Sequence, residues 1–135
     1  MSSRAALPVS RAYPSAGRCI LVVEDELLIR FPLSEALRDV GFQVIEASNA
    51  DEALDVLATV SPDLVISDVR MPGSLDGLGL LAIIRSRFPS LPVIIVSGHL
   101  PPSLALQDGA TQFLSKPYDI EAVFQAIDAE LGAAI

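Results

Sequence analysis

Short hydrophobic runs alternate with amphipathic segments along the whole chain. The runs fall at residues 19–23, 42–47, 64–66, 92–96 and 112–114, and apolar runs of this length predict strands that are buried on both faces. The segments that follow them repeat apolar residues every three or four positions, as amphipathic helices do. Strands and helices in regular alternation predict one parallel sheet with helices on both faces. The pattern therefore indicates an α/β protein with a doubly wound, five-stranded parallel sheet.

The first and last amphipathic segments carry the clearest apolar faces. The first is expected to bury Leu28, Ile29, Leu33, Leu37 and Val40, and the last to bury Ile120, Val123, Phe124, Ile127 and Leu131. Pro32 lies inside the first segment, where it removes one backbone donor and predicts a kink. Asn49, with Glu52 three residues later, and Asp119 before the last segment predict helix N-termini.

The fourth helical segment is predicted to be short. Pro101 and Pro102 delay its start, and Gly109 is a natural helix stop. The residues left between them, 103–107, allow only about two turns.

Composition narrows the classes of protein that fit this pattern. The 135 residues suit one domain, and residues 1–17 lack any period, which predicts a flexible tail before a folded domain at 18–135. The net charge of −8 disfavours nucleic acid and anionic membranes as partners, because both need clustered Lys and Arg.

No apolar run reaches the about 18 residues of a membrane span, and the N-terminus lacks the apolar stretch of a signal peptide. The single cysteine, Cys19, excludes an internal disulfide framework, so a cytoplasmic location is expected.

Polar residues gather where the predicted strands end. Glu24 and Asp25 follow the first strand, Asp68 follows the third, Ser97 the fourth and Lys116 the fifth. Because the carboxyl ends of parallel strands lie at the same edge of a sheet, these side chains are expected to converge. Ligands of open α/β sheets bind at this edge.

These residue types together suit phosphoryl chemistry. Carboxylates in one place repel one another and need a cation, and oxygen ligands without His or Cys favour Mg²⁺. The Lys and the Ser hydroxyl can bind phosphoryl oxygens, so we expect Asp68 to be a nucleophile that forms an aspartyl phosphate. Taken singly, each residue has a plainer interpretation: Asp68 and the acidic run as caps, Ser97 as a turn residue, and Lys116 as a surface charge.

Four motifs strengthen the joint interpretation. They are ILVVEDE at 20–26, DLVISDVRMPG at 63–73, VSG at 96–98 and FLSKP at 113–117. In this order, at the ends of the predicted strands, they resemble the receiver domain of two-component response regulators, the CheY-like family. The resemblance covers about residues 18–133 and implies a flavodoxin-like fold with strand order 2-1-3-4-5.

The resemblance implies a Mg²⁺ site. Asp68 is then the phosphoacceptor and, together with Asp25, a Mg²⁺ ligand. Arg70 adds its backbone carbonyl as a third ligand, and Glu24 acts mainly through water.

The resemblance also implies a switch. Ser97 is the hydroxyl that moves toward the phosphoryl group, and Phe113 is the aromatic residue coupled to that movement, although Phe113 could simply pack in the core. Lys116 pairs with the phosphate, and the peptide bond between Lys116 and Pro117 is expected to be cis.

Two features depart from the family pattern. Ser74 and Leu75 lengthen the loop after the third strand. The 19-residue spacing from Ser97 to Lys116 is short for the family by close to one helical turn. The shortfall falls on the fourth helix, so we expect that helix to be shortened or irregular and the output face to be unusual.

The expected function is that of a stand-alone receiver that takes a phosphoryl group from a histidine kinase or a histidine phosphotransfer protein. No DNA-binding or enzymatic segment is recognisable, so output is expected through an unknown target protein, through a homodimer on the face of helix four, strand five and helix five, or as a phosphate sink. Beyond self-catalysed phosphorylation and dephosphorylation, no enzyme activity is expected.

Three other classes of function share features with this one. A receiver-like module could bind partners or dimerise without phosphorylation. A phosphatase with an aspartate nucleophile would need a second acid two residues after Asp68, where Arg70 stands. A nucleotide-binding fold would need a Gly-rich phosphate loop after the first strand, and none follows it.

Overall fold

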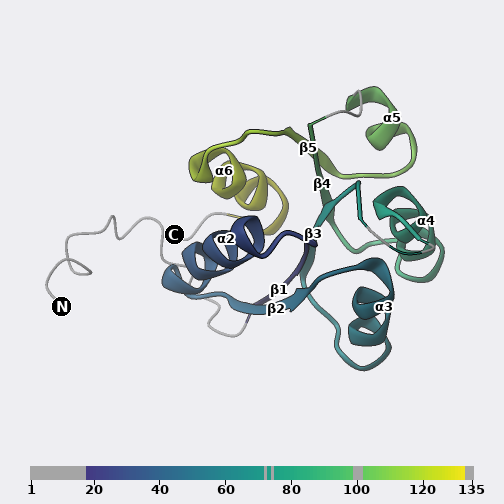
Figure 1. The fold of residues 1–135 in the computed structure, drawn as a ribbon, viewed down its shortest axis with the longest axis horizontal. Coiled ribbons are helices and arrows are strands. Elements are labelled where there is room, and N and C mark those ends of the chain that lie inside the picture. Colours follow the sequence, from purple (N-terminus) through teal and green to yellow (C-terminus); the bar gives the residue numbers. More distant parts are fainter. Residues whose placement is uncertain (1–17, 72, 74, 99–101, 133–135) are drawn as a thin grey trace, which may run out of the picture.

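The computed structural model describes residues 18–71, 73, 75–98 and 102–132, so the flexible tail predicted at 1–17 lies outside the described residues. Strands and helices alternate from β1 to α6 (Figure 1). Their bounds are β1 Cys19–Val23, α2 Leu27–Asp39, β2 Gln43–Ala47, α3 Ala50–Thr59, β3 Leu64–Asp68, α4 Gly77–Arg87, β4 Val93–Ser97, α5 Pro102–Gln107, β5 Gln112–Ser115 and α6 Ile120–Leu131.

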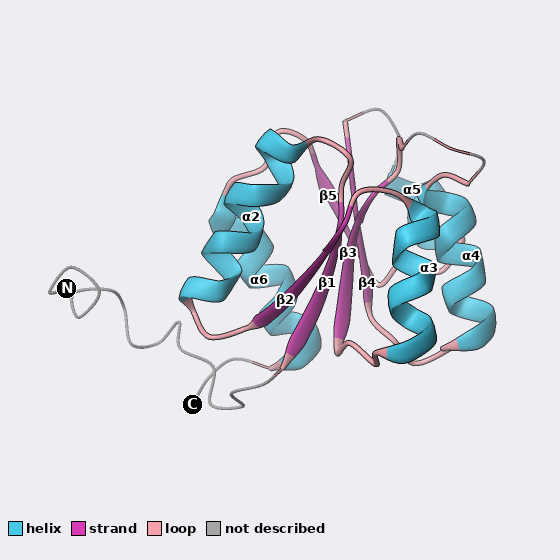
Figure 2. Ribbon diagram, turned by 60° about the horizontal axis from the view of Figure 1, so that its bottom comes forward, coloured by secondary structure: helices cyan, strands magenta, loops and turns pink. Residues whose placement is uncertain are grey.

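The strands form one five-stranded parallel sheet in the order β2-β1-β3-β4-β5, which confirms the predicted fold class and strand order. Helices α2 and α6 cover one face of the sheet, and α3, α4 and α5 cover the other (Figures 1 and 2). Two hydrophobic clusters fill the two layers. Along β1, Leu21 and Val23 belong to the cluster under α3, α4 and α5, whereas Ile20 and Val22 belong to the cluster under α2 and α6.

The central strands are apolar because both of their faces are covered. Every residue of β1, β3 and β4 is buried, whereas β2 and β5 at the two edges are largely half-buried. At about 25 cal/mol per Å² of apolar surface, burial of these runs is the main term that stabilises the sheet. Among the described residues, no helix combines the length and the apolar character that crossing a membrane requires.

Helix α2 departs from its predicted apolar face. Leu33 and Leu37 are buried as expected, but Leu28 is 89% exposed, so the prediction is wrong at that residue. Leu27 and Phe31 are exposed beside it. The helix carries two apolar stripes, and residue spacing alone does not tell which of them faces the sheet.

The predicted helix starts agree with the structure at their caps. The side chains of Asn49 and Asp119 accept hydrogen bonds from the backbone N–H groups three residues later, at 2.8 and 2.9 Å. Pro32 lies inside α2 as predicted. In α6, the expected inner residues Val123, Phe124 and Ile127 are buried. Ile120 is 38% exposed, because it is the first residue of the helix.

Helix α5 is short, as the spacing predicted. It spans the six residues Pro102–Gln107, and Gly109 follows it with φ +107°. The Arg85 side chain of α4 fastens this region, because its Nε donates to the Gly109 carbonyl oxygen at 2.7 Å. The same guanidinium donates to the carbonyl oxygens of Pro89 at 3.0 Å and Phe88 at 3.2 Å, and also to that of Leu91. One charged group therefore joins the end of α4 to the turn after α5.

We expect Arg85→Met to lower the free energy of unfolding by about 2 kcal/mol, because several carbonyl oxygens lose a charged donor. The matched control is Arg87→Met, an exposed position on the same helix, which should change stability by less than about 0.5 kcal/mol. Urea denaturation of the three proteins measures the difference. Equal losses in both variants would contradict a special role for Arg85.

Candidate functional site

The carboxyl edge of the sheet brings three carboxylates together. Glu24 and Asp25 follow β1, Asp68 ends β3, and each offers an oxygen that lies within 4.8 Å of the others. The convergence follows from pairing, because Val23 lies opposite Ser67 in the register of β1 and β3. The residues that come next are therefore neighbours at the same edge.

Lys116 reaches this cluster from the end of β5. Its Nζ lies 3.0 Å from Glu24 Oε1 and 3.3 Å from Asp68 Oδ2. The structure therefore brings together all four charged residues that sequence reasoning assigned to the edge, across 92 positions of chain between Glu24 and Lys116.

Burial makes the charges of the cluster interact strongly. Glu24 and Asp68 are only 4% and 8% exposed, whereas Asp25 is exposed to solvent. Burial raises the pKa of the Glu24 carboxyl, and the hydrogen bond from Lys116 opposes that rise. Burial acts to lower the pKa of Lys116, but the hydrogen bond and charges of Glu24 and Asp68 outweigh it, so the net pKa is raised. The ammonium form of Lys116 therefore compensates the buried carboxylates.

Both oxygens of the Asp68 carboxylate have a defined partner. Asp68 Oδ1 accepts a hydrogen bond from the Val69 N–H at 2.8 Å, and Oδ2 faces the Lys116 ammonium. Its backbone carbonyl accepts a hydrogen bond from Ser67 Oγ at 2.9 Å. The carboxylate is thus held in one orientation at the mouth of the site.

Gly77, the first residue of α4, lies directly against the backbone of Asp68. A Cβ at this position would overlap the Asp68 carbonyl oxygen and come within 2.7 Å of the Val69 Cα. The Gly77 N–H donates to the Val69 carbonyl oxygen at 2.8 Å. Sequence reasoning missed this residue, although the Asp76–Gly77 pair just before an amphipathic segment was a signal for a close helix start.

Ser97 and Arg70 border the cluster. They line a pocket of about 350 Å³ together with Asp25, Asp68 and Lys116. Ser97 is buried at the end of β4. The roles assigned to the Ser97 hydroxyl and to the Arg70 carbonyl stay predictions.

Phe113 lies on β5 opposite Ile95 of β4. Its half-buried ring packs against the cluster under α3, α4 and α5. Because side chains alternate along a strand, Ser97, two residues after Ile95, shares this face of the sheet with Phe113. The peptide bond between Lys116 and Pro117 is cis, in agreement with the resemblance.

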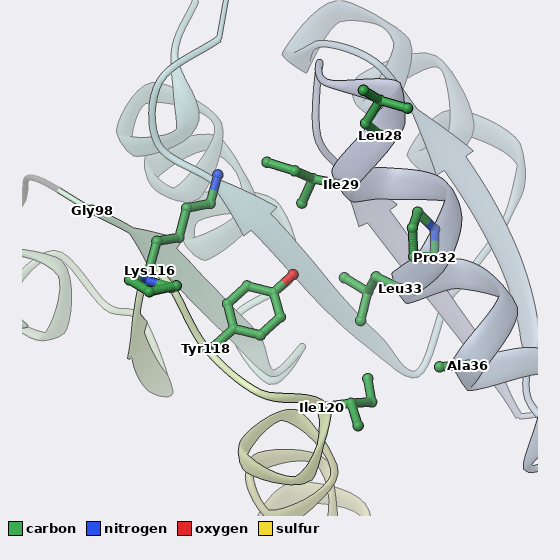
Figure 3. Close-up of a pocket in the computed structure, with 10 residues that line it drawn as sticks. Leu28, Ile29, Pro32, Leu33, Ala36, Gly98, Lys116, Tyr118 and Ile120 are labelled. Atoms are coloured by element: carbon green, nitrogen blue, oxygen red, sulfur yellow. The ribbon is translucent and has the colours of Figure 1, made fainter.

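An apolar groove of about 700 Å³ adjoins the acidic pocket. Leu28, Ile29 and Leu33 of α2 line one side of it, and Tyr118 and Ile120 line the other (Figure 3). The groove shares Ile29, Gly98 and Lys116 with the acidic pocket. Burial raises the pKa of the Tyr118 hydroxyl, and the charge of Glu24 adds to the rise. Sequence reasoning missed the groove, because it assigned Leu28 to the inner face of the helix.

Comparison with known proteins identifies the family of the chain and supports its fold. The family model described as the response regulator receiver domain matches residues 20–128. The chain belongs to the response regulator receiver domain family. Receiver domains accept phosphoryl groups from histidine kinases and bind Mg²⁺ at an acidic site of this kind.

Curated relatives of this receiver domain are much longer proteins. The chain is 41% identical over 110 residues to the DNA-binding transcriptional regulator NtrC of Klebsiella pneumoniae. The aligned region covers 79% of this chain and 23% of that protein. It is 37% identical over 115 residues to the C4-dicarboxylate transport transcriptional regulatory protein DctD of Rhizobium meliloti, covering 83% of this chain and 25% of that protein. The chain thus spans about a quarter of the length of these relatives, and its stand-alone organisation stays a prediction.

Solved receiver structures match the fold closely. The receiver domain of NtrX from Brucella abortus superposes with a TM-score of 0.79 at 36% identity, over 83% of this chain and 97% of that one. The chemotaxis protein CheY4 of Vibrio cholerae gives a TM-score of 0.78 at 28% identity, over 85% of this chain and 99% of that one.

We expect Gly77→Ala to lower the free energy of unfolding by about 3 kcal/mol, because the new methyl group meets backbone atoms that cannot move aside. The control is Gly79→Ala on the same helix turn, where the closest neighbour is the flexible end of the Leu75 side chain. The higher helix propensity of Ala, about 1 kcal/mol, should offset that contact and leave stability nearly unchanged. Thermal and urea denaturation measure both variants, and equal tolerance at the two positions would contradict the proposed close approach.

Proposed function

We propose that this receiver accepts a phosphoryl group on the Asp68 carboxylate from a histidine kinase or a histidine phosphotransfer protein, in a reaction that requires Mg²⁺. The observation that carries the proposal is the contact of one ammonium, Lys116 Nζ, with both Glu24 and Asp68 in a cluster of three carboxylates. A nucleophile, an anion-binding cation and a cation-binding acidic pair would then lie side by side at the carboxyl edge of the sheet.

The residues present fit Mg²⁺. The described cluster offers carboxylate oxygens without His or Cys, and Arg70 lines the pocket beside it. Asp25, Asp68 and the Arg70 carbonyl would hold the ion, with Glu24 acting through water. When bound, the ion supplies positive charge that stabilises the oxygens of the transferred group.

The chain's own residues account for the transfer. An oxygen of the Asp68 carboxylate attacks phosphorus, the new O–P bond forms, and the bond from phosphorus to the donor nitrogen breaks with its electron pair going to the imidazole. Lys116 shifts from the carboxylates to a phosphoryl oxygen. The Ser97 hydroxyl donates a hydrogen bond to a second phosphoryl oxygen. Phe113, which lies on the same face of the sheet, moves together with Ser97.

The groove beside α2 is suited to receive the donor. Leu28 lines this groove with an exposed apolar side chain, and the groove shares residues with the acidic pocket. Leu27 and Phe31 expose further apolar surface on the same helix. A helical partner that carries a histidine could cover this surface and place its imidazole over Asp68.

The output face differs from the donor face. Helix α5 exposes Leu104 and Leu106, which are 46% and 48% accessible. This exposure supports output through a target protein or a second copy, and it favours, as a second candidate function, an interaction module that binds without phosphorylation. Beyond self-catalysed phosphorylation and dephosphorylation, we propose no enzyme activity.

We expect Asp68→Asn to abolish phosphorylation by acetyl phosphate with Mg²⁺, because an amide oxygen is a poor nucleophile. The control is Asp63→Asn, which removes a carboxylate at the opposite end of the same strand, where Asp63 Oδ2 accepts a hydrogen bond from the Cys19 N–H. That variant should still be labelled. Intact-mass spectrometry before and after hydroxylamine treatment reports the acyl phosphate, and adduct that persists on the Asp68→Asn protein would refute the assignment.

Leu28→Ser should slow phosphotransfer from the protein donor by about tenfold, since removing one apolar contact from an interface weakens binding by roughly 1–2 kcal/mol. Labelling by acetyl phosphate should stay unchanged, because Leu28 is exposed and contributes little to the fold. Leu104→Ser on α5 serves as the matched control and should leave both rates unchanged. A loss of transfer in Leu104→Ser with none in Leu28→Ser would place the donor on the other face.

A further inference from the structure

Arg30 of α2 lies behind the acidic pair and binds its backbone. Its Nη1 donates to the Glu24 carbonyl oxygen at 2.8 Å, and its Nε donates to Glu46 Oε1 of β2 at 3.0 Å. The Arg30 side chain is only 16% exposed. The guanidinium thus joins the peptide between Glu24 and Asp25 to the neighbouring strand.

The same peptide segment is held from its other sides. The Glu24 N–H donates to the Ala47 carbonyl oxygen at 3.0 Å, and Glu24 Oε2 accepts from the Glu26 N–H at 3.1 Å. Arg30 supplies the contact to the Glu24 carbonyl, the group that leads directly to Asp25. Because Asp25 is exposed, packing does little to fix its carboxylate, and the direction of that side chain depends on this backbone.

We propose that Arg30 is a positioning residue for the cation site, and that its guanidinium fixes the Glu24–Asp25 peptide in the orientation that binds a divalent cation. The inference rests on the proposed function, because it takes the carboxylate cluster to be a Mg²⁺ site. A planar fork that makes two directed hydrogen bonds restricts the peptide more than a point charge does. Holding a ligand in its binding orientation before the ion arrives raises affinity.

The sign of the charge separates positioning from electrostatics. A guanidinium near the cluster repels a divalent cation, so loss of the charge alone would tighten Mg²⁺ binding. Loss of the positioning contact would weaken it. Weaker binding after removal of Arg30 therefore cannot be a charge effect.

The test is calorimetric titration of Mg²⁺ into the wild-type chain, Arg30→Met, Arg30→Lys and Arg38→Met. Arg38 is the matched control, because it also pairs with Glu46, at 3.1 Å, but it contacts Glu35 and the Val44 carbonyl instead of Glu24. We expect Arg30→Met to raise the Kd for Mg²⁺ by about tenfold, the lower end of what outer partners of metal ligands contribute. Arg30→Lys should lie between this variant and wild type, and Arg38→Met should match wild type.

Each outcome is decisive. If Arg30→Met binds Mg²⁺ as tightly as wild type, or more tightly, the inference about Arg30 fails but the proposed function stands. The same holds if Arg38→Met loses as much affinity as Arg30→Met, because the effect would then come from the ion pairs with β2. A wild-type chain that does not bind Mg²⁺ would overturn the proposed function as well. Circular dichroism checks that each variant is folded, and if Arg30→Met is not, Arg30→Lys decides: weaker binding supports the inference, and wild-type affinity overturns it.

Discussion

The contact between the Lys116 ammonium and two buried carboxylates is the interaction on which the rest of the site depends. Glu24 and Asp68 are neighbours because β1 and β3 pair directly, so the fold forces two like charges together at a poorly hydrated edge. Such a pair is unfavourable without a counter-ion. Lys116 supplies one from β5, on the far side of β4, because its long side chain spans the end of that strand. If the carboxylates bind a cation as we propose, the Lys116 ammonium would be free to pair with an anion.

Much of this arrangement was predictable from the sequence. The bounds of β1 agree to the residue, and the strand order follows once the motifs are placed at strand ends. Parallel topology predicts that Glu24, Asp68 and Lys116 lie at the same edge, because all strand ends point one way. The strand order brings β1 and β3 side by side there. The 19-residue spacing between Ser97 and Lys116 predicted that α5 would be short.

The rest depends on tertiary contacts that residue spacing does not encode. Leu28 and Leu33 both fit an apolar helix stripe, and only the packing of α2 on the sheet decides that Leu33 is covered. Gly77 is set by the approach of a helix start to a strand end, which no local pattern measures. Arg30 and Arg85 act through backbone carbonyl oxygens, and every residue type offers such an oxygen, so the sequence carries no sign of the partner.

These contacts tie the carboxyl edge of the sheet to the helices on both of its faces. Gly77 of α4 rests on the Asp68 backbone from one layer, and Arg30 of α2 binds the Glu24 backbone from the other. Both helices are thus in direct contact with the chain that carries the acidic residues. Helix α5 is under two turns long, and of its residues only Ala105 is buried in the core. The turn that follows α5 is fixed to α4, because Arg85 donates to the Gly109 carbonyl oxygen. If Ser97 and Phe113 shift as we propose, α5 would therefore move about that turn.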